Sequence, residues 1–169
     1  MVLGVPMKCS DIVSFDIDRE LAVRLGIQTV FVVGKDLFVF ERPVQNGKPQ
    51  IIMSDDPGVL ISGVRSPEVL GIIFAGGNLT KAVLERVVEY KKKVYVPVGR
   101  LLSVGMAERG AELGRLRKIV LASRKAGAEV RIITMARSGM EILSGRQLAA
   151  VSGLILDGRR DFGLVGDVL

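Results

Sequence analysis

The hydrophobic positions of this chain form short apolar runs rich in β-branched residues, and these runs alternate with longer segments whose apolar residues recur at helical spacing. This alternation is typical of βα units around a parallel sheet. The apolar runs predict strands at 12–17, 29–33, 37–41, 50–53, 59–62, 71–75, 94–98 and 130–135. The helical spacing predicts helices at 19–25, 79–92, 107–126 and 145–154. The pattern therefore predicts an α/β fold.

One part of the chain departs from this alternation. Asn46 and Gly47 stand between the apolar runs at 37–41 and 50–53. An Asn-Gly pair between two apolar runs is a strong signal for a tight hairpin turn. We therefore expect an antiparallel hairpin excursion near residues 37–53.

Three helix starts have a chemical explanation. Asn78 precedes the helix predicted at 79–92. Asp18 precedes the helix predicted at 19–25 and stands where that helix needs an N-cap. Ser144 and Gln147 form a capping box, in which each side chain satisfies a backbone N–H group of the other residue. These residues predict where the three helices begin.

The length and composition indicate one globular domain. The chain has 169 residues, of which 49% are apolar, so we expect a single domain over 1–169 with a substantial core. Its longest apolar stretches, such as that at 69–75, fall far short of the roughly 18 residues that span a bilayer. The N-terminus has no basic segment before an apolar one. We expect a cytoplasmic protein with no membrane partner.

The absence of histidine excludes several kinds of catalytic site. The sequence contains no histidine and one cysteine, Cys9. Without imidazole there can be no Ser-His-Asp triad, no Cys-His pair and no His-ligated metal. A single cysteine cannot form an intramolecular disulfide, so we expect Cys9 to have a structural role.

Two further patterns could mark sites but have simpler structural explanations. Asp16 and Asp18 are two residues apart and could share a Mg²⁺ ion, but the capping role of Asp18 is the better interpretation. Gly76-Gly77 could present backbone N–H groups to a phosphate, but the glycine spacing matches neither phosphate-binding motif. We expect a plain turn there and no resident metal.

Positive charge is concentrated in one part of the chain. The net charge is +6, with nine basic and eleven acidic residues in 1–90 but fifteen basic and five acidic residues in 91–160. A local excess of this kind is what a surface that binds polyanions requires. Because aromatic residues make up only 5% of the chain, stacking on unpaired bases is not expected. The composition favours recognition of the backbone and shape of a folded RNA.

A basic flank is predicted on the helix at 107–126. Arg117 and Arg124, and likewise Lys118 and Lys125, are seven residues apart and therefore lie beside the apolar stripe of this helix. The sequence thus predicts a row of cations along one helix.

Arg146 has an unusual position. It lies two residues after the cap Ser144, where the positive end of the helix macrodipole disfavours a cation. A bound anion would reverse the sign of that effect. With Arg137 in the preceding loop, the segment is interpreted as a phosphate-binding corner, and a solvated arginine is the alternative.

The run at 94–151 contains four motifs in order. They are Gly99-Arg100-Leu101-Leu102, Leu121-Ala122-Ser123-Arg124-Lys125, Thr134-Met135-Ala136-Arg137-Ser138 and Ser144-Gly145-Arg146-Gln147-Leu148-Ala149. In this order and spacing the run resembles the C-terminal half of archaeal ribonuclease P protein component 3, the counterpart of the human 30-kDa subunit. The segment at 64–77 resembles the middle strand pair of the family more weakly. Gly145 stands where the family commonly has proline, and Met135 replaces a small residue.

The resemblance implies a TIM-like (β/α) barrel, here abbreviated because eight βα units normally need about 200 or more residues. It implies a subunit of a ribonucleoprotein endonuclease that removes 5′ leaders from precursor tRNA, with the RNA subunit performing catalysis. The isolated chain is then expected to be inactive and to hold no cofactor, since the Mg²⁺ belongs to the RNA. The expected partners are ribonuclease P RNA, protein component 2 and, indirectly, precursor tRNA.

With this interpretation we expect a set of basic residues to contact RNA phosphates or to support that surface. They are Arg100, Arg109, Arg117, Lys118, Arg124, Lys125, Arg137 and Arg146. Of these, Arg100, Arg137 and Arg146 are expected to meet at one rim of the barrel. The alternative is a small-molecule barrel enzyme that binds a phosphorylated substrate through Gly76-Gly77 and Arg146, with Asp16 as acid or base.

Overall fold

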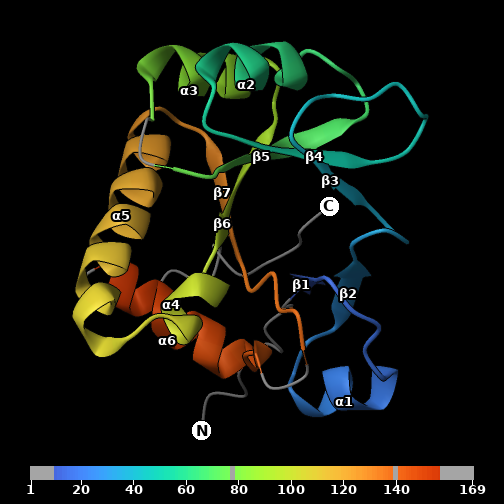
Figure 1. Ribbon diagram of the computed structural model, residues 1–169, viewed down its shortest axis with the longest axis vertical. Coiled ribbons are helices and arrows are strands. Elements are labelled where there is room, and N and C mark those ends of the chain that lie inside the picture. Colours follow the sequence, from blue (N-terminus) through green and yellow to red (C-terminus); the bar gives the residue numbers. More distant parts are fainter. Residues whose placement is uncertain (1–9, 77–78, 139–140, 157–169) are drawn as a thin grey trace, which may run out of the picture.

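The fold alternates strands and helices along the chain. The computed structural model describes residues 10–76, 79–138 and 141–156 (Figure 1). Its elements are β1 (Ser10–Val13), α1 (Arg19–Arg24), β2 (Thr29–Val32), β3 (Phe38–Phe40), β4 (Gln50–Ser54), α2 (Pro57–Val64), β5 (Val69–Phe74), α3 (Lys81–Glu89), β6 (Lys93–Pro97), α4 (Gly99–Ser103), α5 (Met106–Lys125), β7 (Glu129–Ile133) and α6 (Gly145–Ile155). The predicted α/β class is confirmed. In these ranges no helix has the length and apolar character needed to cross a membrane.

The strands pair in parallel. A five-stranded sheet has the order β3-β4-β5-β6-β7, and β1 pairs with β2 in a separate two-stranded sheet. Isolated parallel bridges join Val33, just after β2, to Leu37, just before β3, and join Val13 to Ala136, just after β7. The small sheet therefore meets both edge strands of the large sheet.

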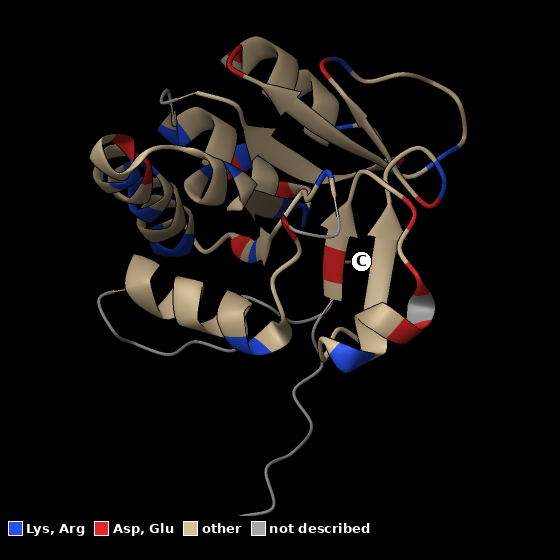
Figure 2. Cartoon of the chain, turned by 60° about the horizontal axis from the view of Figure 1, so that its bottom comes forward, with Lys and Arg blue, Asp and Glu red and all other residues tan. Residues whose placement is uncertain are grey.

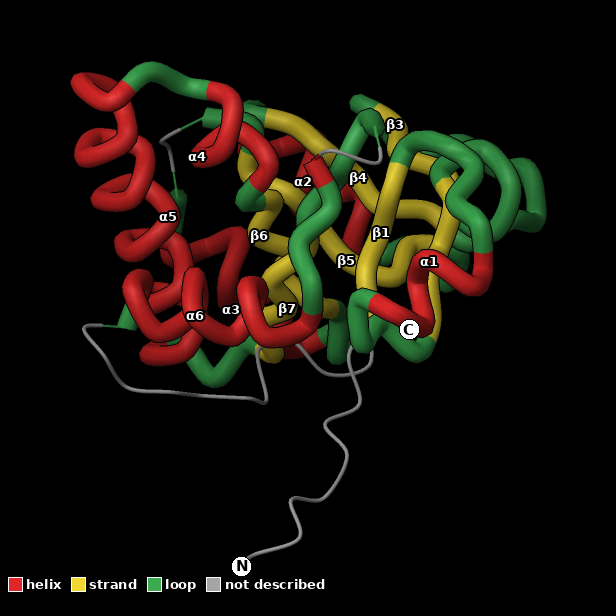
Figure 3. The backbone as a smooth tube through the Cα atoms, turned by 90° about the horizontal axis from the view of Figure 1, so that it is seen from below, coloured by secondary structure: helices red, strands yellow, loops and turns green. Residues whose placement is uncertain are grey.

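Two apolar cores lie on opposite faces of the strands. Neighbouring strand residues alternate between them: Ile52 belongs to the larger core and Ile51 to the smaller. The larger core packs the sheet against the helices, including Leu116 of α5 and Leu148 of α6. Figures 1 and 3 show α5 on the side of the molecule opposite α1, with α6 beside α5. The smaller core is formed by Ile12, Leu37, Ile51, Ile73, Tyr95 and Ile133, all of them in or next to strands.

The predicted antiparallel hairpin near residues 37–53 is wrong. Strands β3 and β4 pair in parallel, with Phe38 opposite Gln50 and Phe40 opposite Ile52. Gly47 adopts a positive φ of 71°, as the turn signal suggests. It lies, however, in the loop between the end of β3 and the start of β4, which brings the chain back so that β4 can run parallel to β3. The buried Gln50 side chain fixes this loop by accepting a hydrogen bond from the Val44 backbone N–H at 3.1 Å. The loop is thus a crossover between parallel strands.

The strand predicted at 59–62 is also wrong, because these residues lie inside α2. The Asp56 side chain accepts a hydrogen bond from the Gly58 N–H at 2.7 Å, and Pro57 occupies the first helical turn. An acidic cap followed by proline is a helix-start signal. It outweighs the short apolar run, whose Leu60 packs into the larger core.

Other boundaries agree with the sequence to within a few residues. The capping box of Ser144 and Gln147 at α6 is confirmed, and so is the cap of α1 by Asp18. Helix α3 begins later than predicted, with Thr80 as its N-cap, and the expected cap Asn78 lies outside the described residues. Strand β1 ends at Val13 instead of continuing to residue 17. The short helix α4 is not predicted by the sequence pattern.

Candidate functional site

Helix α5 carries the predicted basic flank. Its inner face packs through Leu116, Ile119 and Val120, all buried. Lys118 and Lys125 are exposed on the outer side, as are Arg109 and Arg124, while Arg117 is half-buried. Figure 2 shows basic residues repeated along this helix. The helix therefore presents a row of cations to the solvent.

The first turns of α5 also contain a buried ion pair that the sequence analysis did not identify. Arg115 binds both carboxylate oxygens of Glu112, at 2.7 Å and 2.9 Å. The hydrogen bonds and charge of Arg115 hold the pKa of Glu112 below its usual value, against the opposing effect of burial. Arg115 also donates to the backbone oxygens of Phe74 and Gly76, each at 3.4 Å. The Glu-Arg spacing of three residues was the available signal.

A cavity of about 570 Å³ opens where the parallel strands end. Ser14 follows β1, Phe74 ends β5 and Thr134 follows β7, and all three line the cavity. The carboxyl ends of parallel strands are where α/β proteins commonly bind ligands. The cavity is thus a concave candidate for a ligand site.

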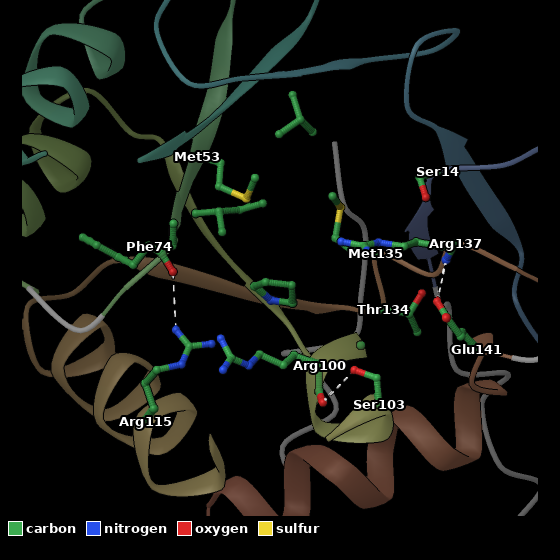
Figure 4. Close-up of a pocket in the computed structure, with 15 residues that line it drawn as sticks. Ser14, Met53, Phe74, Arg100, Ser103, Arg115, Thr134, Met135, Arg137 and Glu141 are labelled. Carbon is green, nitrogen blue, oxygen red and sulfur yellow. Dashed lines mark hydrogen bonds between the residues drawn. The ribbon is translucent and has the colours of Figure 1, made fainter. Parts of the chain in front are cut away.

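Three arginines line this cavity from three different segments. Arg100 comes from α4, Arg115 from α5 and Arg137 from the segment after β7 (Figure 4). Figure 4 shows Arg100 and Arg115 extending toward one another and Arg137 entering from the opposite side. The charge of Arg100 also contributes to lowering the pKa of Glu112, which places it near the Glu112–Arg115 pair.

Gly99 allows α4 to approach the segment after β7. Its backbone N–H donates to the Thr134 oxygen at 3.0 Å, and a Cβ atom at this position would lie 2.6 Å from that oxygen. Any larger residue would push the start of α4 away. Glycine thereby places Arg100 at the cavity.

Arg146 does not join Arg100 and Arg137. It lies in the first turn of α6, exposed, after the cap Ser144, and it is not among the residues that line the cavity. The start of α6 instead contacts α1, since the Gly145 N–H donates to the Leu25 oxygen at 3.0 Å. The structure therefore brings together two of the three arginines expected at one rim, and adds Arg115.

The acidic residues considered for a metal pair have other partners. Asp16 forms an ion pair with Lys35 at 2.6 Å, and Asp18 accepts the Glu20 N–H at 3.0 Å as the cap of α1. Within 10–76, 79–138 and 141–156, no group of three or more His, Cys, Asp or Glu side chains could hold a metal ion. Cys9 and Gly77 lie outside these ranges.

A buried carboxyl group joins β1 to the segment after β7. Asp11 is fully buried and accepts hydrogen bonds from the Thr134 N–H at 2.7 Å, the Thr134 hydroxyl at 2.5 Å and the Ile12 N–H at 2.8 Å. Burial raises the pKa of Asp11 to about 6, although these hydrogen bonds oppose the shift. Asp11 thereby fixes Thr134, one of the residues that line the cavity.

The described residues offer several ways to bind anions. The basic row on α5 and the arginines of the cavity supply positive charge and hydrogen-bond donors. The nearby carboxyl groups are engaged as a helix cap, in ion pairs or in the buried Asp11–Thr134 contact. Comparisons of the chain with protein-family models and with curated protein sequences find no match.

Proposed function

We propose that this chain is a protein subunit of ribonuclease P that supports the RNA-catalysed removal of 5′ leaders from precursor tRNA. The observation that carries the proposal is the order and spacing of the four motifs between 94 and 151, which resemble archaeal component 3. These motifs fall on α4, the end of α5, the segment after β7 and the capped start of α6. Each motif thus coincides with a boundary of an element or with a surface of the fold.

The arrangement of strands supports the finer proposal of an abbreviated TIM-like barrel. The two isolated bridges connect β2 to the edge next to β3 and connect β1 to the edge next to β7. The smaller apolar core receives residues from strands at both ends of this series, including Ile12 and Ile133. A barrel interior filled by one layer of strand side chains would have this composition.

In this proposal, the basic residues act through RNA phosphates. Lys118 and Lys125 lie exposed on α5 in a row that suits the backbone of a folded RNA. Arg109, Arg117 and Arg124 extend or support that row on the same helix. Protein component 2 would be a second partner. The catalytic Mg²⁺ would belong to the RNA subunit.

A specific observation favours a second candidate, a barrel enzyme acting on a phosphorylated small molecule. The cavity lies at the ends of the strands, where barrel enzymes bind their substrates. However, neither Asp16 nor Arg146 is among the residues that line it. The acid or base expected for that candidate is instead paired with Lys35.

Two experiments separate the candidates. Affinity purification of the tagged chain from its host, followed by RNA sequencing, is expected to recover one abundant structured RNA. Recovery of only the RNA found with an untagged control would contradict the ribonucleoprotein proposal. The purified chain alone is expected not to cleave precursor tRNA in Mg²⁺. Cleavage that survives repurification and is lost in Asp16→Ala would support the enzyme instead.

A further inference from the structure

The cavity at the ends of the strands has the dimensions of a small-molecule site. Its volume of about 570 Å³ lies within the range of roughly 300 to 1,000 Å³ that is common for ligand pockets. Val39, Met53 and Ile73 give the cavity an apolar part. The polar side chains come from other segments of the lining, so the ligand would meet both kinds of surface.

Two of the arginines that line the cavity form no ion pair with the described residues. Among the described residues, the guanidinium groups of Arg100 and Arg137 take part in no ion pair and no side-chain hydrogen bond. Arg137 is held only through its backbone N–H, which donates to the Glu141 carboxylate at 2.7 Å. Like charges that face one concave space repel each other, and an anion between them removes the repulsion. These two residues are therefore available to a ligand.

The third arginine is fixed in advance. Glu112 neutralises the charge of Arg115 and holds its guanidinium in a fixed plane through two hydrogen bonds. The backbone oxygens of Phe74 and Gly76 hold the same side chain at the end of β5. Arg115 thus forms a rigid wall, and Arg100 and Arg137 are the described cations of the lining that form no ion pair.

Hydroxyl-binding groups line the same cavity. Among the described residues of the lining, Glu141 supplies a carboxylate, and the hydroxyl groups of Ser14 and Ser103 donate to the backbone oxygens of Ala136 and Arg100 and so face a ligand as acceptors. A carboxylate repels a phosphate but accepts hydrogen bonds from sugar hydroxyls. The lining therefore has a cationic part suited to a phosphate and a polar part suited to hydroxyl groups.

We propose that this cavity binds a sugar phosphate, with its phosphomonoester held by Arg137 and by an Arg100 side chain turned from Arg115 toward it, and its hydroxyl-bearing body toward Glu141 and Ser14. A phosphomonoester carries nearly two negative charges at pH 7, which matches two guanidinium groups that form no ion pair. Arginine also binds phosphate through two parallel hydrogen bonds. The site is independent of the proposed role in ribonuclease P.

Titration of the full chain with ribose 5-phosphate by isothermal calorimetry tests the proposal. Ribose and inorganic phosphate are the matched ligand controls. The sugar phosphate is expected to bind with about tenfold or greater affinity than ribose, because only the phosphate makes charge-assisted hydrogen bonds. Binding should also exceed that of inorganic phosphate, which lacks the hydroxyl-bearing body. Equal or absent binding of ribose 5-phosphate and ribose would overturn the proposal.

Variants locate the site. Arg100→Gln and Arg137→Gln are each expected to raise the dissociation constant for ribose 5-phosphate about tenfold or more. Arg65→Gln, which removes an exposed arginine at the end of α2 that does not line the cavity, is the matched control and should leave the constant nearly unchanged. Thermal unfolding of each variant checks that the fold persists. Equal weakening by Arg65→Gln would show a general charge effect and contradict the site.

Competition with RNA tests whether the cavity recognises a terminal phosphomonoester or a phosphodiester within an RNA strand. Two short oligoribonucleotides, one with and one without a 5′-terminal phosphate, are added to the complex with ribose 5-phosphate. The proposal predicts that only the terminally phosphorylated one competes at the cavity. If the oligonucleotide without a terminal phosphate competes equally well, the cavity recognises a phosphodiester, and the assignment of a phosphomonoester is wrong.

Discussion

The outer face of α5 and the cavity at the ends of the strands are both basic, but their geometry differs. Lys118 and Lys125 follow one another along a single helix, and both are exposed. Arg100 and Arg137 come from different segments and line one concave space, Arg100 beside Arg115 and Arg137 on the opposite side (Figure 4). A row on a convex helix suits the long-range attraction of a polyanion, whereas convergence suits one anionic group. Net charge alone does not separate these two roles.

The largest expected effect is the weakening of RNA binding by salt, because the cations of α5 are proposed to bind RNA phosphates. If about five cations of the chain neutralise RNA phosphates, the logarithmic slope of affinity against salt concentration is roughly −3.5 to −4.5. A fourfold rise in salt would then weaken RNA binding by about 100- to 500-fold. Filter binding over a series of KCl concentrations measures the slope. A slope near zero would contradict the account of α5.

A change of pH is expected to change the free energy of unfolding through Asp11, which holds Thr134 at the cavity, and not through the surface of α5. Because the pKa of Asp11 is raised from 3.8 to about 6, the folded state holds its proton more tightly than the unfolded state. This contribution to the free energy of unfolding is complete below about pH 3.8 and is lost as the pH rises through about 6. The loss would be on the order of 2 to 3 kcal/mol.

Asp11→Asn removes this titration, because the amide stays neutral and still accepts from the Thr134 N–H. Chemical unfolding should show a higher free energy of unfolding for the variant than for the parent at pH 7, and a smaller difference at pH 4. The exposed Asp56→Asn variant, at the cap of α2, is a control for general changes in charge. A parent chain whose stability does not change between pH 4 and pH 7 would contradict the assignment.

Arg146 tests whether the corner of α6 belongs with the surface of α5 or is merely solvated. Its charge opposes the helix macrodipole, so Arg146→Ala should leave stability unchanged or raise it by up to about 0.5 kcal/mol. Loss of a phosphate contact should weaken assembly by about 1.5 to 3 kcal/mol. The measurements are the melting temperature and reconstituted tRNA processing at limiting protein, with Arg65→Ala, an exposed cation at the end of α2 outside the proposed RNA surface, as a control. A lower melting temperature with unchanged processing would show a structural role.

Single substitutions on α5 are expected to have the smallest effects. Lys118 is exposed and forms no ion pair with the described residues. Lys118→Ala should therefore change the free energy of unfolding by less than about 0.5 kcal/mol. It should reduce the steepness of the salt dependence by about 0.7 to 0.9 if the residue contacts a phosphate. An unchanged slope would remove Lys118 from the RNA surface.

The sequence predicts elements best where one local signal dominates. The capping box of Ser144 and Gln147 and the cap formed by Asp18 each depend on residues within one helix turn and were identified correctly. The Asn46-Gly47 turn was misinterpreted because a local turn signal does not determine whether the next strand runs parallel or antiparallel. That direction depends on contacts across the sheet.

The candidate site shows the same limit. The basic row of α5 follows from sequence spacing, but the cavity depends on how the strands bring Arg100 and Arg137 together. Arg115 was missed because its partners include the backbone of Phe74, which is 41 residues away in sequence. Asp11 was missed because its burial and its contact with Thr134, 123 residues away, exist only in the folded chain.

Reconstitution of precursor tRNA cleavage tests the central claim most directly. Ribonuclease P RNA and protein component 2 are assembled with no further subunit, with this chain, or with its Lys118→Glu/Lys125→Glu variant. The account predicts that the unaltered chain increases removal of the 5′ leader and that the charge-reversed variant, correctly folded by circular dichroism, increases it much less. Cleavage that is the same with and without the chain would contradict the account.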